Sequence, residues 1–353
     1  MSVSVPCLIR SRGAGGEPVV RLGMPLIDDY LEFLAGRCRP NTVLAAGYDL
    51  KVFFSVVGKA PEQVRPVDVL AFVTAQRTGR TGDQVLQRVD PSGEHSGVGS
   101  STVARRLSSI FGFFGYLQAR GDVPANPVPR GLPTRRERSR PGQGVPLTRR
   151  TRRLPRILTP AQVDALTGAL RTHRDRAMVA AMVLGGLRRC EMLGLRMEDL
   201  RVAERRVFIA DSKGGHQRLV PVSARFFAAV AAYLDAERPA GADTDRVFVV
   251  LKGPNRAKPL SAKGLDEVLA GARRRAGLAH ATCHELRHTC LTRLREAGMA
   301  LEAVQAQAGH ASIESTRIYL HLADDWLASQ YRKAAEVIDA QVFTGLPLTG
   351  SQR

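Results

Sequence analysis

The sequence predicts a mainly α protein with two domains, an N-terminal helical domain and a C-terminal α+β domain that carries a small β-hairpin sheet. Its 353 residues, 44% of them apolar, are enough for two ordinary hydrophobic cores. Apolar residues recur at helical spacing over most of the chain. One stretch is β-like instead, "RVFIADSKGGHQRLVPV", and its Gly214-Gly215 pair is typical of a hairpin turn.

The N-terminal domain is expected over residues 24–122, after a flexible arm over residues 1–23 that holds Gly and Arg without periodicity. Asn41-Thr42 predicts a helix cap. The helix after it should bury Leu44, Tyr48, Phe53 or Phe54, and Val57. A later helix begins at Ser100-Ser101, and its buried face should hold Val103, Leu107, Ile110, Phe111, Phe114 and Leu117. The polar, Gly-rich residues 79–99 predict a long loop inside this domain.

The chain is strongly basic, with 52 Lys and Arg against 33 Asp and Glu, a net charge of +19 and a pI near 10.7. This balance favours a polyanionic partner, and nucleic acid is the first candidate. The five cysteines are scattered without C-x-x-C spacing, which indicates neither a disulfide framework nor a cysteine zinc site. No apolar run approaches the length of a membrane span. We therefore expect a protein of the reducing cytoplasm with no membrane partner.

A basic linker is predicted over residues 123–157, between the two domains. Residues 130–156 hold ten Arg and one acid, which supplies +9 of the net +19. Six prolines over residues 127–155 exclude a regular helix. The segment could be a merely solvated charge run, but its place between two domains of a basic protein favours contact with a phosphate backbone. The candidate DNA-binding residues are Arg149, Arg150, Arg152 and Arg153 of the linker, with Arg105 and Arg106 of the helical domain.

The C-terminal domain is expected over residues 158–342, followed by a tail over residues 343–353. Thr159 can cap its first helix, with Pro160 at the first helical position. Breaking a DNA phosphodiester without a metal requires donors around the phosphorane oxygens, a nucleophile, and a proton donor for the leaving oxygen. This domain contains side chains of all three kinds, in the order Arg188, Lys213, His284, Arg287, His310 and Tyr319.

The spacing of these residues indicates how they could work together. Glu191 follows Arg188 by one helical turn and could orient its guanidinium. His284 and Arg287 are three apart on one helix face, so both can point at one phosphate. Lys213 lies at the tip of the predicted hairpin, where its flexible stem can reach into a cleft. Each residue taken singly has an ordinary structural explanation, and only their order and spacing together favour a shared site.

One of these segments also matches a zinc protease motif, because His284-Glu285-Leu286-Arg287-His288 satisfies H-E-x-x-H. Zinc catalysis needs a third protein ligand. Leu291 and Leu294 stand where the extended motif requires Gly and His, although a distant Glu302 or Glu314 could be proposed. The zinc interpretation leaves most of the other candidate residues and the net charge unexplained. We therefore expect no metal and no other cofactor, with His288 in a packing or supporting role.

The motifs "GLRRCEMLGLR", "SKGGHQRLVPV", "HELRHTCLTRL" and "AGHASIESTRIYLH" closely resemble those of the tyrosine recombinase, or phage integrase, family. The resemblance covers residues 156–335 strongly. It extends weakly over residues 25–122, which look like the family's helical core-binding domain. It implies metal-free DNA cleavage through a 3′-phosphotyrosine intermediate. The roles that it implies are nucleophile for Tyr319, general acid for Lys213, phosphate clamp for Arg188, Arg287, His284 and His310, and support for Glu191.

From the resemblance we expect a site-specific recombinase or integrase, encoded by a mobile element and associated with the nucleoid. Its partners would be double-stranded DNA with inverted half-sites and further copies of the chain in a homo-tetramer. Apolar residues after Tyr319, Trp326 among them, recur at helical spacing and predict a helix. This helix could pack on its own domain, but the resemblance favours docking on a neighbouring protomer. The alternatives are a type IB topoisomerase-like nicking-closing enzyme and a DNA-binding protein that recombines nothing. The first lacks the G-H-x-x-x-x-x-T-x-x-Y run, and the second would not need every catalytic position filled.

Overall fold

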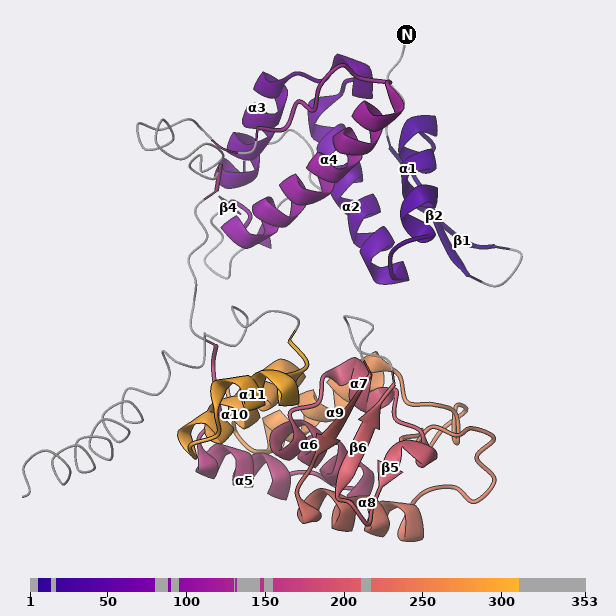
Figure 1. Cartoon of the computed structure of the whole chain (residues 1–353), viewed down its shortest axis with the longest axis vertical. Helices are drawn as coiled ribbons and strands as arrows, with labels where there is room; N and C mark the ends of the chain where they lie inside the picture. The colour runs from indigo at the N-terminus through magenta and orange to yellow at the C-terminus, as the bar shows by residue number, and fades with distance from the viewer. Residues whose placement is uncertain are drawn as a thin grey trace, which may run out of the picture. The chain divides into compact units, whose positions relative to one another are not determined.

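The computed structural model describes residues 6–13, 17–79, 88–89, 95–129, 131, 147–148, 155–210 and 217–310, with residues 88–89 and 95–96 described by their backbone alone. The chain divides into two compact units, Met1–Arg152 and Arg153–Arg353, and the division falls within the expected linker (Figure 1). Both units are mainly helical, which confirms the predicted fold class. None of the described helices is both long and apolar enough to cross a membrane.

The first unit packs four helices against a short strand pair (Figure 1). Its elements are β1 (Ile9–Arg12), β2 (Pro18–Arg21), α1 (Pro25–Ala35), α2 (Pro40–Val57), the 3₁₀ turn η1 (Pro61–Gln63), α3 (Pro66–Thr78), β3 (Arg88–Val89), β4 (His95–Ser96) and α4 (Ser100–Arg120). Proline occupies the first position of α1, α2 and α3, where its fixed φ suits a helix start. α2 therefore begins at Pro40, and the expected cap at Asn41-Thr42 lies inside the first turn instead.

Buried aromatic rings form the centre of the first unit. The rings pack mostly edge to face, with centroids 5.1 Å apart for Phe53 and Phe72 and for Phe113 and Phe114. Phe113 is fully buried, whereas the expected Phe111 is only half-buried, because the helix turns residue 111 toward the edge of the buried face. Tyr48, also expected in the core, is 46% exposed, and its hydroxyl accepts a hydrogen bond from Arg10 at 2.9 Å.

The expectation of a flexible arm over residues 1–23 is wrong for its two strands. β1 and β2 pair antiparallel, and Val20 of β2 and Leu22 just after it are buried against α2. Gly47 of α2 makes this contact possible, since a Cβ there would lie 2.9 Å from the Val20 side chain. The first residues of the expected linker also belong to this unit, because Val123 and Val128 are buried in its core. Their side chains extend the core beyond the end of α4.

The two arginines expected to bind DNA from this unit, Arg105 and Arg106, face a buried carboxylate. Asp49 is 1% exposed and lies 2.5 Å from Arg105 and 3.8 Å from Arg106. The Ser109 hydroxyl donates a third contact at 2.8 Å, and Arg106 also donates to Gln76. The Arg105 side chain remains 50% exposed, but only 14% of Arg106 is. Arg106 therefore mainly connects α4 to α2 through its ion pair with Asp49.

The second unit surrounds a buried central helix, α6. Its elements are α5 (Pro160–Gly168), α6 (His173–Gly185), α7 (Arg189–Leu193), the 3₁₀ turn η3 (Met197–Asp199), β5 (Leu200–Arg201), β6 (Arg206–Ile209), β7 (Arg218–Pro221), α8 (Ala224–Ala236), α9 (Ala262–Arg275), α10 (Cys283–Glu296) and α11 (Leu301–Ala308). α6 packs against α8 and α10 and contributes most of its side chains to the core (Figure 1). The Thr159 cap is confirmed, with Thr159 accepting from the Gln162 amide at 3.2 Å.

The predicted hairpin is confirmed as part of a three-stranded antiparallel sheet in the order β5-β6-β7. Val207 faces Val220 in the register of β6 and β7, and both are buried. The pairing directs one face of each strand to the core, as period-two alternation requires. The turn with Lys213 and the Gly214-Gly215 pair lies outside the described residues.

We expect Asp49→Ala to lower the free energy of unfolding by roughly 3 kcal/mol, because it leaves a half-buried cation without its counter-charge. Urea denaturation of the full chain measures the change. Asp29→Ala is the matched control, since Asp29 and Arg120 form an exposed ion pair of 2.8 Å that should contribute less than about 1 kcal/mol. Equal losses in both variants would show that the Asp49 contacts do not hold α2 and α4 together.

Candidate active site

A glycine turn between α6 and α7 places Arg188 at the start of α7. Gly186 ends α6 with a left-handed φ of +67°, a conformation that favours glycine. A Cβ at Gly186 would also lie 3.3 Å from the Leu291 side chain. Leu187 is fully buried next in the chain, and Arg188 follows as the N-cap of α7. The turn thus fixes the backbone of Arg188 while its side chain stays partly exposed.

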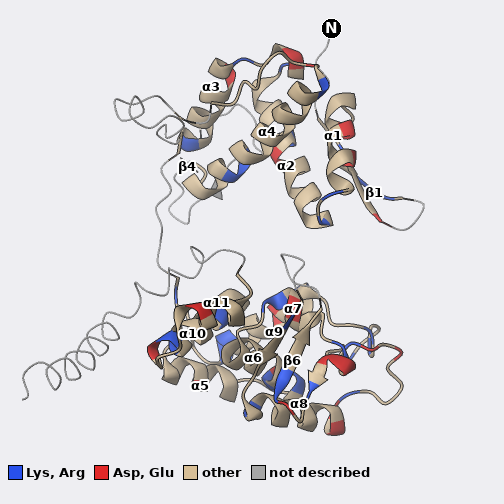
Figure 2. Cartoon of the chain, viewed as in Figure 1, with Lys and Arg blue, Asp and Glu red and all other residues tan. Residues whose placement is uncertain are grey.

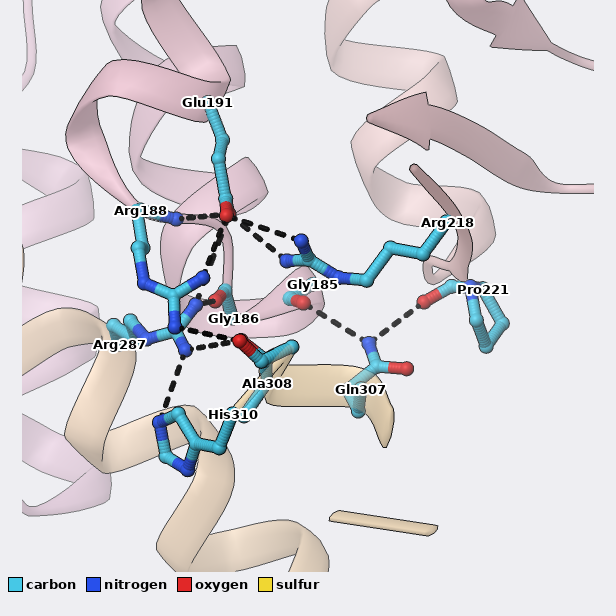
Figure 3. Close-up of polar contacts among 11 residues, drawn as sticks. Gly185, Gly186, Arg188, Glu191, Arg218, Pro221, Arg287, Gln307, Ala308 and His310 are labelled. Carbon is cyan, nitrogen blue, oxygen red and sulfur yellow. Dashed lines mark hydrogen bonds and ion pairs between the residues drawn. The ribbon is translucent and has the colours of Figure 1, made fainter. Parts of the chain in front are cut away.

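The Glu191 carboxylate is the centre of the cluster (Figure 3). Its side chain is fully buried, and its oxygens accept from the Arg188 amide at 2.9 Å and from the Arg188 guanidinium at 2.7 Å. Arg218, on β7, donates to both oxygens at 3.1 and 2.9 Å. Arg287 lies 3.8 Å from the same carboxylate. Three arginines from distant parts of the chain therefore meet at one acid, which leaves an excess of positive charge.

Arg287, on α10, is 4% exposed and directed into the unit. Its guanidinium donates to the Gly186 carbonyl and to the Ala308 carbonyl, each at 2.5 Å. It also lies 3.3 Å from His310 Nε2. Arg287 therefore connects the turn before Arg188 with the end of α11.

His310 follows α11 through Gly309, whose φ is +58°. The Gly309 carbonyl accepts from Arg188 at 2.9 Å, so the peptide beside His310 is part of the arginine cluster. Gln307 holds this end of α11 in place by donating to the carbonyls of Gly185 and Pro221 at 2.9 and 3.0 Å (Figure 3). As a result α6, β7 and α11 meet at one buried amide.

His284 lies on the same helix as Arg287 and has an exposed edge. Its Nε2 is 2.7 Å from Nε2 of His288, one turn later, so one ring donates and the other accepts. His288 thus contacts His284 directly, and its expected supporting role stays a prediction. Glu285, the third residue of the zinc motif, caps the helix instead: it accepts from the Thr282 amide at 2.9 Å and lies 3.2 Å from His280. Among the described residues no group of three or more His, Cys, Asp or Glu is placed to hold a metal ion.

Burial and the neighbouring guanidinium groups keep the imidazoles neutral. Burial, followed by the charges of Arg287 and Arg188, lowers the pKa of His310 to about 4. Burial and then His284 lower the pKa of His288 to about 4, and partial burial with Arg287 lowers that of His284. Burial by itself would raise the pKa of Glu191, but hydrogen bonds from Arg218 and Arg188 lower it overall. The cluster thus presents charged arginines and neutral histidines to an anion.

The structure brings together five of the expected site residues: Arg188, Glu191, His284, Arg287 and His310. Lys213, Tyr319 and the linker arginines Arg149, Arg150, Arg152 and Arg153 lie outside the described residues. Arg105 and Arg106 belong to the other unit.

Two residues of the cluster, Arg218 and Gln307, were not predicted. Arg218 stands within the quoted motif "SKGGHQRLVPV", and Gln307 directly precedes the motif "AGHASIESTRIYLH". Arg218 lies on the same face of β7 as the buried Val220, opposite the exposed Leu219, and the sequence carries no signal for this direction because Leu219 is the more apolar of the two neighbours.

Comparison with known proteins identifies the second unit. Residues 156–325 match the model of the phage integrase family. A tyrosine recombinase XerC of Roseiflexus castenholzii is 31% identical over 297 residues, which cover 80% of this chain and 83% of that protein. A tyrosine recombinase of Thermosipho africanus is 28% identical over 303 residues, covering 85% and 94%.

Solved structures share the fold at lower identity. The Tn1549 transposon integrase in complex with transposon right end DNA matches with a TM-score of 0.65 and 18% identity, covering 88% of this chain and 98% of that one. The XerH site-specific recombinase bound to a palindromic difH substrate matches with a TM-score of 0.62 and 18% identity, covering 88% and 84%.

The lowered histidine pKa values predict a loss of stability in mild acid. Between pH 6.5 and about 4 the unfolded chain binds protons that the folded histidines do not, so stability is complete above pH 6.5 and declines as the pH falls through this window. His310→Gln should reduce this decline, because one of the groups no longer titrates. Thermal unfolding midpoints from pH 7.5 to 4.5 measure it, at roughly 2–4 °C for each kcal/mol. Identical pH slopes in both proteins would contradict the assignment.

Proposed function

Because the chain belongs to the phage integrase family of tyrosine recombinases, we propose that it cuts and rejoins DNA strands at specific sites through a covalent 3′-phosphotyrosine intermediate. The observation that carries this proposal is the convergence of Arg188, Arg287 and His310 around the buried Glu191, with His284 on the same helix as Arg287. Arginines fixed by a carboxylate and by backbone carbonyls are preorganised donors for the charge of a phosphorane.

In the proposed reaction the Tyr319 oxygen attacks the scissile phosphorus while its proton passes to a neutral histidine of the site, and the bond from phosphorus to the 5′-oxygen breaks. The 3′-phosphate remains on Tyr319, and Lys213 donates a proton to the leaving 5′-oxygen. Arg188 and Arg287 stabilise the phosphorane oxygens, and neutral His284 and His310 can donate hydrogen bonds to them. A 5′-hydroxyl of a second strand then attacks the phosphotyrosine and restores the phosphodiester. No step in this scheme asks for a metal.

The DNA partner in this proposal is a duplex with inverted half-sites, bound by a homo-tetramer. Its support is the net charge of +19 and the basic residues of both units (Figure 2). The DNA complexes of the transposon integrase and of XerH share the fold. Residues 24–122 would form the core-binding domain and residues 123–157 the backbone-contacting linker. The segment with Trp326, outside the described residues, would dock on the neighbouring protomer.

We further propose that the protein acts on the nucleoid, as the product of a mobile element. The relatives named above are recombinases, which favours strand exchange over a nicking-closing activity. Exchange between two labelled duplexes separates these two activities, since a nicking-closing enzyme would only relax supercoils.

Tyr319→Phe should reduce the covalent protein–DNA adduct to background while leaving DNA affinity within about twofold, because only the nucleophilic oxygen is lost. A nicked suicide duplex, on which religation is blocked, measures the adduct by gel shift under denaturing conditions. Tyr48→Phe removes an exposed hydroxyl in the other unit and is the control that should keep full adduct. Full adduct with Tyr319→Phe would sink the nucleophile assignment.

Lys213→Ala should slow cleavage of an ordinary 5′-oxygen by about 10²-fold or more, yet slow cleavage of a 5′-bridging sulfur far less, since a thiolate leaves without a proton. Single-turnover rates on the two substrates give the comparison. Lys252→Ala, at an exposed lysine of the same unit, is the matched control. Equal slowing of both substrates by Lys213→Ala would remove this lysine from the acid role.

A further inference from the structure

We propose that Arg218 is a positioning residue for the phosphate-binding arginines, which it controls by occupying the Glu191 carboxylate. This inference rests on the proposed function, because it concerns the same phosphate site. Arg218 would not touch the phosphate itself. Its effect would reach the reaction through Glu191 and through the peptide that precedes His310.

The first support is the saturation of the carboxylate. A carboxylate has about four acceptor sites. Those of Glu191 are used by the Arg188 amide, by the Arg188 guanidinium and by both terminal nitrogens of Arg218. The side chain of Glu191 is 0% exposed, so water would not replace a lost donor. Arg218 therefore supplies half of the hydrogen bonds that satisfy this buried acid.

The second support is that Arg218 keeps the Glu191 carboxylate from competing with the phosphate for Arg188 and Arg287. Arg287 lies 3.8 Å from Glu191, too far for a hydrogen bond, and its donors are directed to carbonyls and toward His310. Without Arg218, the unsatisfied carboxylate would attract Arg287 and hold Arg188 more tightly. A carboxylate and a phosphate compete for the same guanidinium groups. By occupying Glu191, Arg218 weakens the hold of this carboxylate on the other two arginines.

The third support is the contact of Arg218 with the peptide before His310. A Cβ at Gly309 would lie only 2.7 Å from the Arg218 guanidinium carbon, so the guanidinium packs directly against this peptide. The carbonyl of Gly309 accepts from Arg188. Arg218 thus contacts the acid that orients Arg188 and the backbone that places His310. It also stands five residues after Lys213 in the chain, on the strand that follows the hairpin turn.

The test compares variants of the full chain in two measurements: affinity for a half-site duplex, and the single-turnover rate of adduct formation on the suicide substrate. Arg218→Gln should slow adduct formation by about 10- to 100-fold, the range known for outer groups that orient metal ligands, with affinity within about threefold. Arg218→Lys should recover part of the rate, since it keeps the charge but not the bidentate geometry. Arg174→Gln is the matched control, because Arg174 is similarly buried and paired with Asp175 away from the site.

A double-mutant cycle separates positioning from a general loss of structure. If Arg218 acts mainly through Glu191, adding Arg218→Gln to Glu191→Gln should cost much less rate than Arg218→Gln costs alone, because the competing charge is already absent. Fully additive losses, or a wild-type rate for Arg218→Gln, would overturn the inference. If Arg218→Gln lowers the melting temperature far more than Arg174→Gln does, Arg218→Lys decides: a reduced rate at an unchanged melting temperature supports the inference, and a wild-type rate overturns it.

The wild-type chain run in parallel distinguishes this inference from the function on which it rests. A wild-type protein that forms no adduct would overturn the proposed function, and the role of Arg218 with it. A wild-type adduct with an unaffected Arg218→Gln variant would overturn the role of Arg218 alone.

Discussion

A single buried carboxylate organises the second unit. Glu191 is desolvated, and burying a charge is costly unless charged donors surround it. Arg188 at the start of α7 and Arg218 of β7 donate to it, and Arg287 of α10 lies 3.8 Å away, so side chains from distant parts of the chain gather around one acid. Satisfying one acid therefore fixes the relative positions of a helix start, a strand and a second helix. The same contacts leave the guanidinium groups in excess over the carboxylate, so the cluster carries a net positive charge.

The C-terminal ends of two helices offset part of the positive charge that the single Glu191 carboxylate does not neutralise. The carbonyls that accept from Arg287 and Arg188 belong to Gly186, Ala308 and Gly309, at the C-terminal ends of α6 and α11. The C-terminal end of a helix carries partial negative charge and stabilises a nearby cation. The partial negative charges of two helix ends and the charge of Glu191 thus offset the repulsion among the three neighbouring guanidinium groups. The histidines contribute to this balance by remaining neutral, since their protonation would add more charge of the same sign.

The sequence was sufficient for the helical architecture, the β6–β7 hairpin and the order of the candidate residues. Periodicity and motif spacing report on contacts that are local or that recur in a known family. It was not sufficient for Arg218, because an arginine on a short strand looks the same whether it faces solvent or an acid 27 positions away. β1 was missed for a related reason: its four residues are all exposed, so no alternation marks them. Periodicity also placed Phe111 in the core instead of Phe113, which lies two residues later on the same helix and is fully buried.

The contact between Gly309 and Arg218 ties the evolution of two distant positions together. Any side chain at position 309 would have to occupy the space of the guanidinium at position 218 and would also have to adopt a left-handed backbone. A larger residue at position 309 would therefore displace this guanidinium, and its displacement would leave the buried acid short of donors. We therefore expect Gly309 and Arg218 to be retained together in proteins that keep the buried Glu191.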